Sequence, residues 1–150
     1  MGTLNALLDL ARQRAVELGL SYQGALTPAE AWQIWQLAPG AKLVDIRTRA
    51  ELEWVGRIPG TVDIEYELWP SGQVNNRFMM QLRQSVSPEA LVMFICRSGR
   101  RSDETASLAA RSGYNNCYNV LEGFEGSLDA NSQRGHVGGW KLAGLPWEQA

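Results

Sequence analysis

Short apolar runs alternate with segments of helical period along this 150-residue chain, and this alternation constrains the fold more than any other feature. We predict strands at residues 42–46, 62–64, 91–95 and 117–121, and helices at residues 28–38, 49–54, 76–84 and 102–111. Strands that are joined by helices pair in parallel. We therefore predict an α/β fold with a central, mainly parallel sheet flanked by helices on both faces.

The amino-terminal part of the chain is predicted to be helical. Residues 4–18 form an amphipathic stripe, and Thr27-Pro28-Ala29-Glu30 is a capping box at the start of a helix. A second capping box, Thr48 with Glu51, begins the short helix at residues 49–54. We predict an amino-terminal helical extension, residues 1–40, packed on a single domain of residues 41–150. Docking of the amphipathic stripe to a partner or to a second copy of the chain is the alternative.

Composition excludes several classes of function. The net charge of −2 gives nucleic acid and anionic membranes no reason to bind, and the longest apolar stretch, Ala90–Cys96, is far shorter than a membrane span of about 18 residues. No secretion signal precedes the first basic residue, Arg12, so we expect a cytosolic protein. With two cysteines and one histidine, His136, the chain cannot build a four-ligand Cys/His zinc site. We expect neither a metal nor a cofactor.

The best candidate for chemistry is Cys96, which follows the most apolar strand and precedes a helix. A thiol is nucleophilic as the thiolate, and a helix amino terminus with nearby arginines lowers the pKa of such a thiol to about 7 or below. Three arginines follow within five residues, and Ser98 and Gly99 are small enough to let backbone N–H groups converge. The pattern predicts a thiolate in an anion-binding loop that needs no histidine. Taken alone, a cysteine at a strand end is more often a small buried hydrophobe, which is how we interpret Cys117.

The loop Cys96-Arg97-Ser98-Gly99-Arg100-Arg101-Ser102 closely resembles the active-site loop of rhodanese-like sulfurtransferases. Two further segments resemble signatures of that family: Val44-Asp45-Ile46-Arg47 with Glu51 and the stretch 56–61, and the stretch 118–124. The chain ending, residues 139–147, is also similar. Arg57 replaces the usual histidine and Thr61 the usual alanine, but neither position is part of the thiol loop.

The resemblance implies that Cys96 takes a sulfur atom from a small anionic donor such as thiosulfate and passes it, as a persulfide, to cyanide or to a small-molecule or protein thiol. We expect Arg97 and Arg100 to attract the donor. Backbone amides of residues 97–101 should stabilise the developing sulfur anion, and Arg101 and Ser102 should close the loop. The substrate-binding set is thus Arg97, Ser98, Gly99, Arg100, Arg101 and Ser102. Asp45, Arg47 and Glu51 are expected to be structural support.

Two alternatives stay open. A cysteine-dependent phosphatase or arsenate reductase of related fold also uses a cysteine and an arginine, but related phosphatases place five residues between them, and only four separate Cys96 from Arg101. A noncatalytic rhodanese-like module that only binds partners is the other. Such a module is expected to lack the cysteine or part of the loop.

Overall fold

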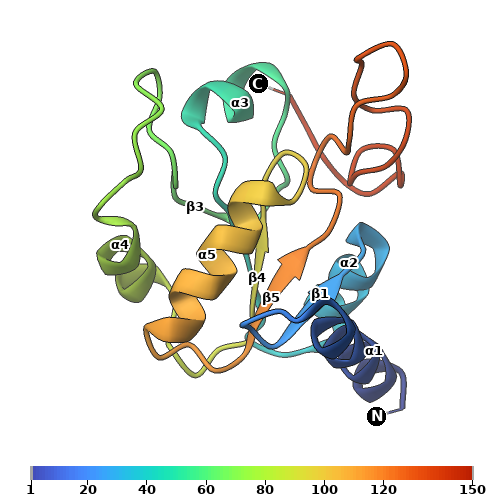
Figure 1. The fold of residues 1–150 in the computed structure, drawn as a ribbon, viewed down its shortest axis with the longest axis vertical. Coiled ribbons are helices and arrows are strands. Elements are labelled where there is room, and N and C mark those ends of the chain that lie inside the picture. The colour runs from blue at the N-terminus through green and yellow to red at the C-terminus, as the bar shows by residue number, and fades with distance from the viewer. Residues whose placement is uncertain (1, 150) are drawn as a thin grey trace.

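A five-stranded parallel sheet forms the centre of the protein, whose computed structural model describes residues 2–149 (Figure 1). The strand order is β1-β5-β4-β2-β3. The strands are β1 (Gly24–Leu26), β2 (Lys42–Asp45), β3 (Val62–Asp63), β4 (Val92–Ile95) and β5 (Cys117–Val120). The helices are α1 (Gly2–Leu18), α2 (Pro28–Leu37), α3 (Arg49–Trp54), α4 (Phe78–Ser85) and α5 (Arg100–Arg111). The predicted α/β class and the parallel sheet are confirmed.

Alternation along the strands divides the core into two layers. On one face, Phe94 and Cys96 pack with residues of α4 and α5, such as Phe78 and Ala106. On the other face, residues of β4 such as Ile95 pack with α1 and α2. Helices therefore cover both faces of the sheet, and Figure 1 shows α5 lying along β4. A strand buried on both faces explains why the run at residues 91–95 is apolar throughout.

Both predicted capping boxes are present. The Thr27 hydroxyl accepts the N–H of Glu30, whose carboxylate accepts the N–H of Thr27. Thr48 and Glu51 make the same reciprocal pair at the start of α3. Each pair satisfies two backbone donors that a helix start leaves free, which is why these two helix starts could be placed from the sequence.

Helix α1 begins at Gly2, two residues before the predicted stripe, and three further elements differ from the predicted ones. Strand β1 was not predicted; it is only three residues long and pairs with β5 at the sheet edge. Helix α4 begins two residues late, since the Asn75 side chain accepts the N–H of Arg77 before the helix starts. Helix α5 begins two residues early, at Arg100, because Gly99 adopts a φ of 109° and turns the chain directly into the helix.

The amino-terminal segment lies against the domain through α1 and β1. Ala11 and Ala15 of α1 are buried, and Arg14 binds both Glu30 and the carbonyl of Ala25. The boundary placed at residue 40 stays a prediction, and β1 shows that the segment before it contributes a strand to the sheet.

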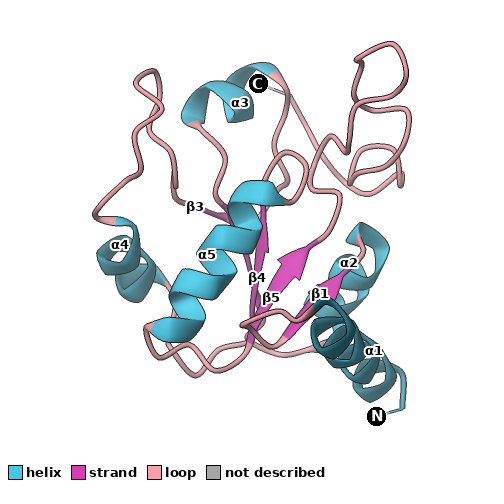
Figure 2. Ribbon diagram, in the orientation of Figure 1, coloured by secondary structure: helices cyan, strands magenta, loops and turns pink. Residues whose placement is uncertain are grey.

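The chain after β5 runs mainly as loop (Figure 2), and residues 123–139 contain five glycines, which favour turns and loops. Among residues 2–149, no helix is both long and apolar enough to cross a membrane.

Candidate active site

Cys96 lies at the carboxyl end of β4, in the turn that leads into α5. Its side chain is buried, with 1% of the residue exposed. Gly99 is the residue before the helix, and its positive φ of 109° folds the turn back over the sulfur. An L-residue with a Cβ rarely adopts this conformation, so the sequence Cys-x-x-Gly is what lets four residues, 96–99, connect the strand to the helix.

Three hydrogen-bond donors converge on the Cys96 sulfur. The backbone N–H of Gly99 lies 3.1 Å from Sγ and the N–H of Ser102 lies 3.3 Å from it. The hydroxyl oxygen of Ser102 is 3.1 Å from Sγ and can donate its proton to a thiolate. The amides belong to the amino terminus of α5, where the helix dipole also favours a negative charge. This arrangement of donors is suited to stabilise a negative charge on the sulfur.

The Arg101 side chain binds Glu51 of α3. Its two terminal nitrogens each lie 2.9 Å from a carboxylate oxygen of Glu51, and only 7% of its side chain is exposed. Burial by itself raises the pKa of Glu51, but the hydrogen bonds and charge of Arg101, together with Thr48, outweigh burial and lower that pKa to about 2. This ion pair fastens the first turn of α5 to α3. What Arg101 offers to the loop is its backbone N–H, since its guanidinium is engaged elsewhere.

The other two arginines of the loop are exposed at the surface. Arg97 is exposed, and 64% of the Arg100 side chain is accessible. Arg100 lies 3.0 Å from Glu104 and 3.5 Å from Glu67. The loop thus separates its arginines into one buried anchor and two exposed charges that a small anion meets first.

Asp45, the last residue of β2, forms an ion pair with Arg47 and not with the thiol loop. Their side chains are fully buried and 2.7 Å apart, and Arg47 also binds the carbonyl of Gly56. The Arg47 guanidinium stacks 4.0 Å from the centre of the Phe124 ring. The structure thus pairs Asp45 with Arg47, whereas Glu51 is paired with Arg101.

Two residues of the loop environment were not singled out from the sequence. Asn119 of β5 donates from Nδ2 to the carbonyl of Gly99, at 3.3 Å. Gly123 sits so close behind the loop that a Cβ there would lie 2.5 Å from the carbonyl carbon of Arg97. The N–H groups of Phe124 and Glu125 bind the carbonyls of Cys96 and Arg97. The one sequence signal was an asparagine in an otherwise apolar strand.

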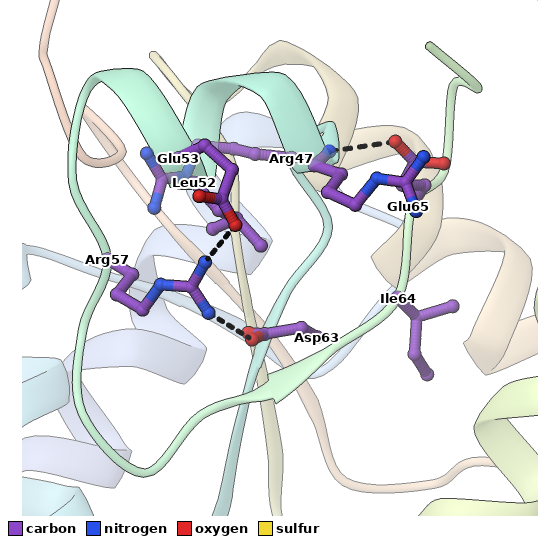
Figure 3. A pocket seen from close by; sticks show the side chains of 8 residues that line it. Arg47, Leu52, Glu53, Arg57, Asp63, Ile64 and Glu65 are labelled. Atoms are coloured by element: carbon purple, nitrogen blue, oxygen red, sulfur yellow. Dashed lines mark hydrogen bonds and ion pairs between the residues drawn. The ribbon is translucent and has the colours of Figure 1, made fainter. Parts of the chain in front are cut away.

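A cavity of about 380 Å³ lies between α3 and β3 (Figure 3). Arg57 spans it, 3.2 Å from Glu53 and 4.0 Å from Asp63. Burial raises the pKa of Asp63. None of the residues that line this cavity belongs to the stretch 96–102. Two carboxylates thus compensate Arg57, as two others compensate Arg100 of the loop.

The single histidine is remote from this chemistry. His136 lies in the loop after β5, exposed, with its Nδ1 2.8 Å from a carboxylate oxygen of Asp129. Cys117 lies at the start of β5, opposite Val92 in the register, four residues from Cys96 along the sheet. At about 3.3 Å per residue the two cysteines are roughly 13 Å apart along the strand direction. No disulfide can join them.

The fold and the site together define a class: a parallel α/β domain with a single thiol held by backbone amides at a helix amino terminus. A model of the rhodanese-like domain family matches residues 27–130. The chain therefore belongs to the rhodanese-like family.

Individual relatives agree with the family. The crystal structure of Rv0390 from M. tuberculosis is 40% identical and has a TM-score of 0.80, over 87% of this chain and 100% of that one. An uncharacterized protein of Rickettsia rickettsii is 39% identical over 110 residues, 72% of this chain and 83% of that protein. The thiosulfate sulfurtransferase GlpE of Actinobacillus succinogenes is 27% identical over 125 residues, 83% of this chain and 90% of that protein.

Proposed function

We propose that this protein is a sulfurtransferase that carries a sulfur atom as a persulfide on Cys96. The observation that carries the proposal is the set of three donors on Sγ, from Gly99 and Ser102. Hydrogen bonds to the thiolate form favour it, so the nucleophile is available without a general base. The distant relative GlpE, named as a thiosulfate sulfurtransferase, supports thiosulfate as the donor class.

The reaction has two steps and needs no oxidant. In the first, the Cys96 thiolate attacks the outer sulfur of thiosulfate; a new sulfur–sulfur bond forms, the old one breaks, and sulfite leaves with the bonding electron pair. In the second, cyanide or a thiolate attacks the outer sulfur of the persulfide, and Cys96 leaves as the thiolate. The products are thiocyanate or a persulfide on the acceptor. Both steps move a sulfane sulfur between two nucleophiles in a cytosolic reaction.

The loop residues divide the work. Arg97 and Arg100, both exposed, attract the dianionic donor by charge. The outer sulfur of the persulfide is bonded to the buried Sγ of Cys96 and lies on its outward side. The amides at the start of α5 stabilise the negative charge of this outer sulfur. Arg101 and Glu51 keep the first turn of the helix in place.

Phosphate transfer fits this loop less well. A cysteine phosphatase uses backbone amides and an arginine to hold three phosphate oxygens. Here four residues separate Cys96 from Arg101, and Glu51 already binds both terminal nitrogens of Arg101. A noncatalytic module fits less well too, because such a module has no need of three donors aimed at one sulfur atom.

Mass spectrometry of the intact protein tests the proposal. Reduced protein is incubated with thiosulfate, desalted, weighed, and digested for peptide mapping. We expect a gain of one sulfur atom, located on Cys96 and removed by cyanide with release of thiocyanate. The Cys117→Ser variant is the matched control and should gain the same atom. Turnover of p-nitrophenyl phosphate that disappears in Cys96→Ser, without any sulfur gain from thiosulfate, would favour the phosphatase instead.

A further inference from the structure

Asn119 is a polar residue in a place where the fold calls for an apolar one. It lies on β5 with only 3% of the residue exposed, and its neighbour across the sheet is Phe94 of β4. Cys117, two residues earlier, belongs to the apolar core layer under α5. Since side chains alternate along a strand, Asn119 faces the same layer. Its Oδ1 is buried and has no hydrogen-bond partner among residues 2–149. An unpaired buried carbonyl costs stability, so core packing does not account for this residue.

The side-chain amide of Asn119 donates a hydrogen bond to the thiol loop. Its Nδ2 donates to the carbonyl oxygen of Gly99, at 3.3 Å. The same oxygen accepts the N–H of Asp103 at 3.1 Å, as the first hydrogen bond of α5. Two donors thus fix the direction of the Gly99 carbonyl.

The direction of the Gly99 carbonyl determines which backbone N–H groups of the loop face the sulfur of Cys96. A trans peptide is planar, with its C=O and N–H pointing in opposite directions. When the Gly99 carbonyl points along α5 toward Asn119 and Asp103, the N–H of Arg100 points out of the helix amino terminus, on the side of the Cys96 loop. The N–H of Gly99 itself lies on Sγ, at 3.1 Å. Gly99 has a φ of 109° and no side chain of its own, so the orientation of its carbonyl depends on these hydrogen bonds.

We propose that Asn119 is a positioning residue for sulfur transfer, which holds the Gly99 carbonyl so that the amides of Gly99 and Arg100 face the sulfur atoms carried by Cys96. The inference rests on the proposed function for its consequence in turnover. Its geometric content, the orientation of amides around the thiol, is independent of which group the thiol transfers.

The variant Asn119→Leu separates positioning from packing. Leucine has the same four-atom side chain branched at Cγ, with methyl groups that are larger than the amide atoms; it lacks the donor and also removes the unpaired Oδ1. We expect an unchanged or higher melting temperature, together with an alkylation of Cys96 by iodoacetamide at pH 7 that is slower by about tenfold, the loss associated with one hydrogen bond to a charged group. The rate of sulfur loading from thiosulfate should fall by a similar factor, with little change in KM, because Asn119 does not contact the donor.

Tyr114→Phe is the matched control. The Tyr114 hydroxyl is buried in the same core layer and donates to the carbonyl of Val86, away from the thiol loop. This variant should lower the melting temperature and leave the alkylation rate of Cys96 unchanged. We therefore expect Asn119→Leu to slow the alkylation of Cys96 without lowering the melting temperature, and Tyr114→Phe to lower the melting temperature without changing the alkylation rate.

Alkylation of Cys96 at the wild-type rate in a folded Asn119→Leu protein would overturn the positioning role. If that variant does not fold, Asn119→Ser, which is smaller and strips the amide donor, carries the same expectation. The wild-type protein could fail to take sulfur from thiosulfate while the Asn119→Leu variant is still alkylated more slowly than wild type. That result would uphold the positioning role and refute the proposed function. The two failures are thus distinguishable.

Discussion

The two cysteines lie in the same core layer but differ in their hydrogen-bond partners. Cys96 and Cys117 are equally buried, at 1% and 0% exposure. Cys96 stands at the carboxyl end of its strand and receives donors from Gly99 and Ser102. Cys117 stands at the beginning of its strand, where its thiol donates to the carbonyl of Tyr114. Burial raises the pKa of Cys117 to about 12.

Burial alone therefore does not decide which hydrogen bonds a thiol receives. What matters is which end of the sheet it occupies. At the carboxyl end of a parallel strand the chain enters a helix by its amino terminus, where free N–H groups and the helix dipole favour an anion. At the other end the neighbouring groups are carbonyls, which favour the protonated thiol. Each of the following changes tests this contrast between the two thiols.

Exchange of each thiol for a hydroxyl should have the largest effect. We predict that Cys96→Ser abolishes sulfur transfer, since serine is nearly isosteric but far less nucleophilic at neutral pH, and that Cys117→Ser keeps most of it. Both activities are measured as thiocyanate formed from thiosulfate and cyanide, with circular dichroism to establish folding. A Cys117→Ser protein that is folded and as inactive as Cys96→Ser would end the one-thiol mechanism.

The convergence of donors can be broken without touching the thiol. One glycine inserted between Ser98 and Gly99 should lower the rate of sulfur transfer by about a hundredfold, because the amides no longer meet at the sulfur. An insertion between Asn131 and Ser132, in the exposed loop after β5, is the control and should leave the rate close to wild type. Equal activity of both insertions would mean that donor geometry is not what activates Cys96.

The ion pair between Glu51 and Arg101, behind the thiol loop, makes the free energy of unfolding depend on pH in the acid range. We expect no such acid dependence from Cys117. Glu51 has a folded-state pKa of about 2 against 4.5 for its ordinary value, so its contribution is complete above pH 4.5 and is lost as pH falls toward 2. We predict that Glu51→Gln lowers the free energy of unfolding at pH 7 by about 3 kcal/mol and flattens this acid dependence. Urea titrations between pH 3 and pH 7 measure both. Parallel pH curves for the two proteins would contradict this role of the pair.

The Cys117 end should show the opposite dependence, at alkaline pH. Its folded pKa of about 12 lies above the ordinary 9.0, so its contribution is complete below pH 9 and is lost as pH rises toward 12. At pH 10 we expect the wild-type protein to have lost about 1 kcal/mol that Cys117→Val keeps. Denaturation at pH 8 and pH 10 provides the comparison. An equal loss in both proteins would assign the alkaline effect to other groups.

The exposed charges should have the smallest effect. Arg97→Ala and Arg100→Ala are predicted to raise the apparent KM for thiosulfate about threefold each at low ionic strength, with kcat nearly unchanged, because they attract the donor outside the covalent step. Added salt should reduce the difference from wild type. Wild-type kinetics in both variants at low salt would remove these arginines from donor binding.

The sequence was informative where structure is set locally. The capping boxes at Thr27 and Thr48 placed two helices, and Cys96 with the loop after it indicated the site. The sequence could not show strand β1, whose three residues have no recognisable period of their own and become a strand only by pairing with β5. It also could not assign partners to charges: Glu51 and Arg101 are fifty residues apart, and their pairing depends on where α3 and α5 meet.

The sequence by itself determined the alternation of strands and helices and the chemistry of the loop, because hydrophobic period, helix caps and a thiol before a helix are properties of neighbouring residues. Only the tertiary structure decided how the two cysteines differ in environment, which arginine is an anchor, and that Asn119 lies behind Gly99. Those facts depend on strand order and register, which bring distant segments together. Register is set by packing across the whole sheet, and no short stretch of sequence contains it.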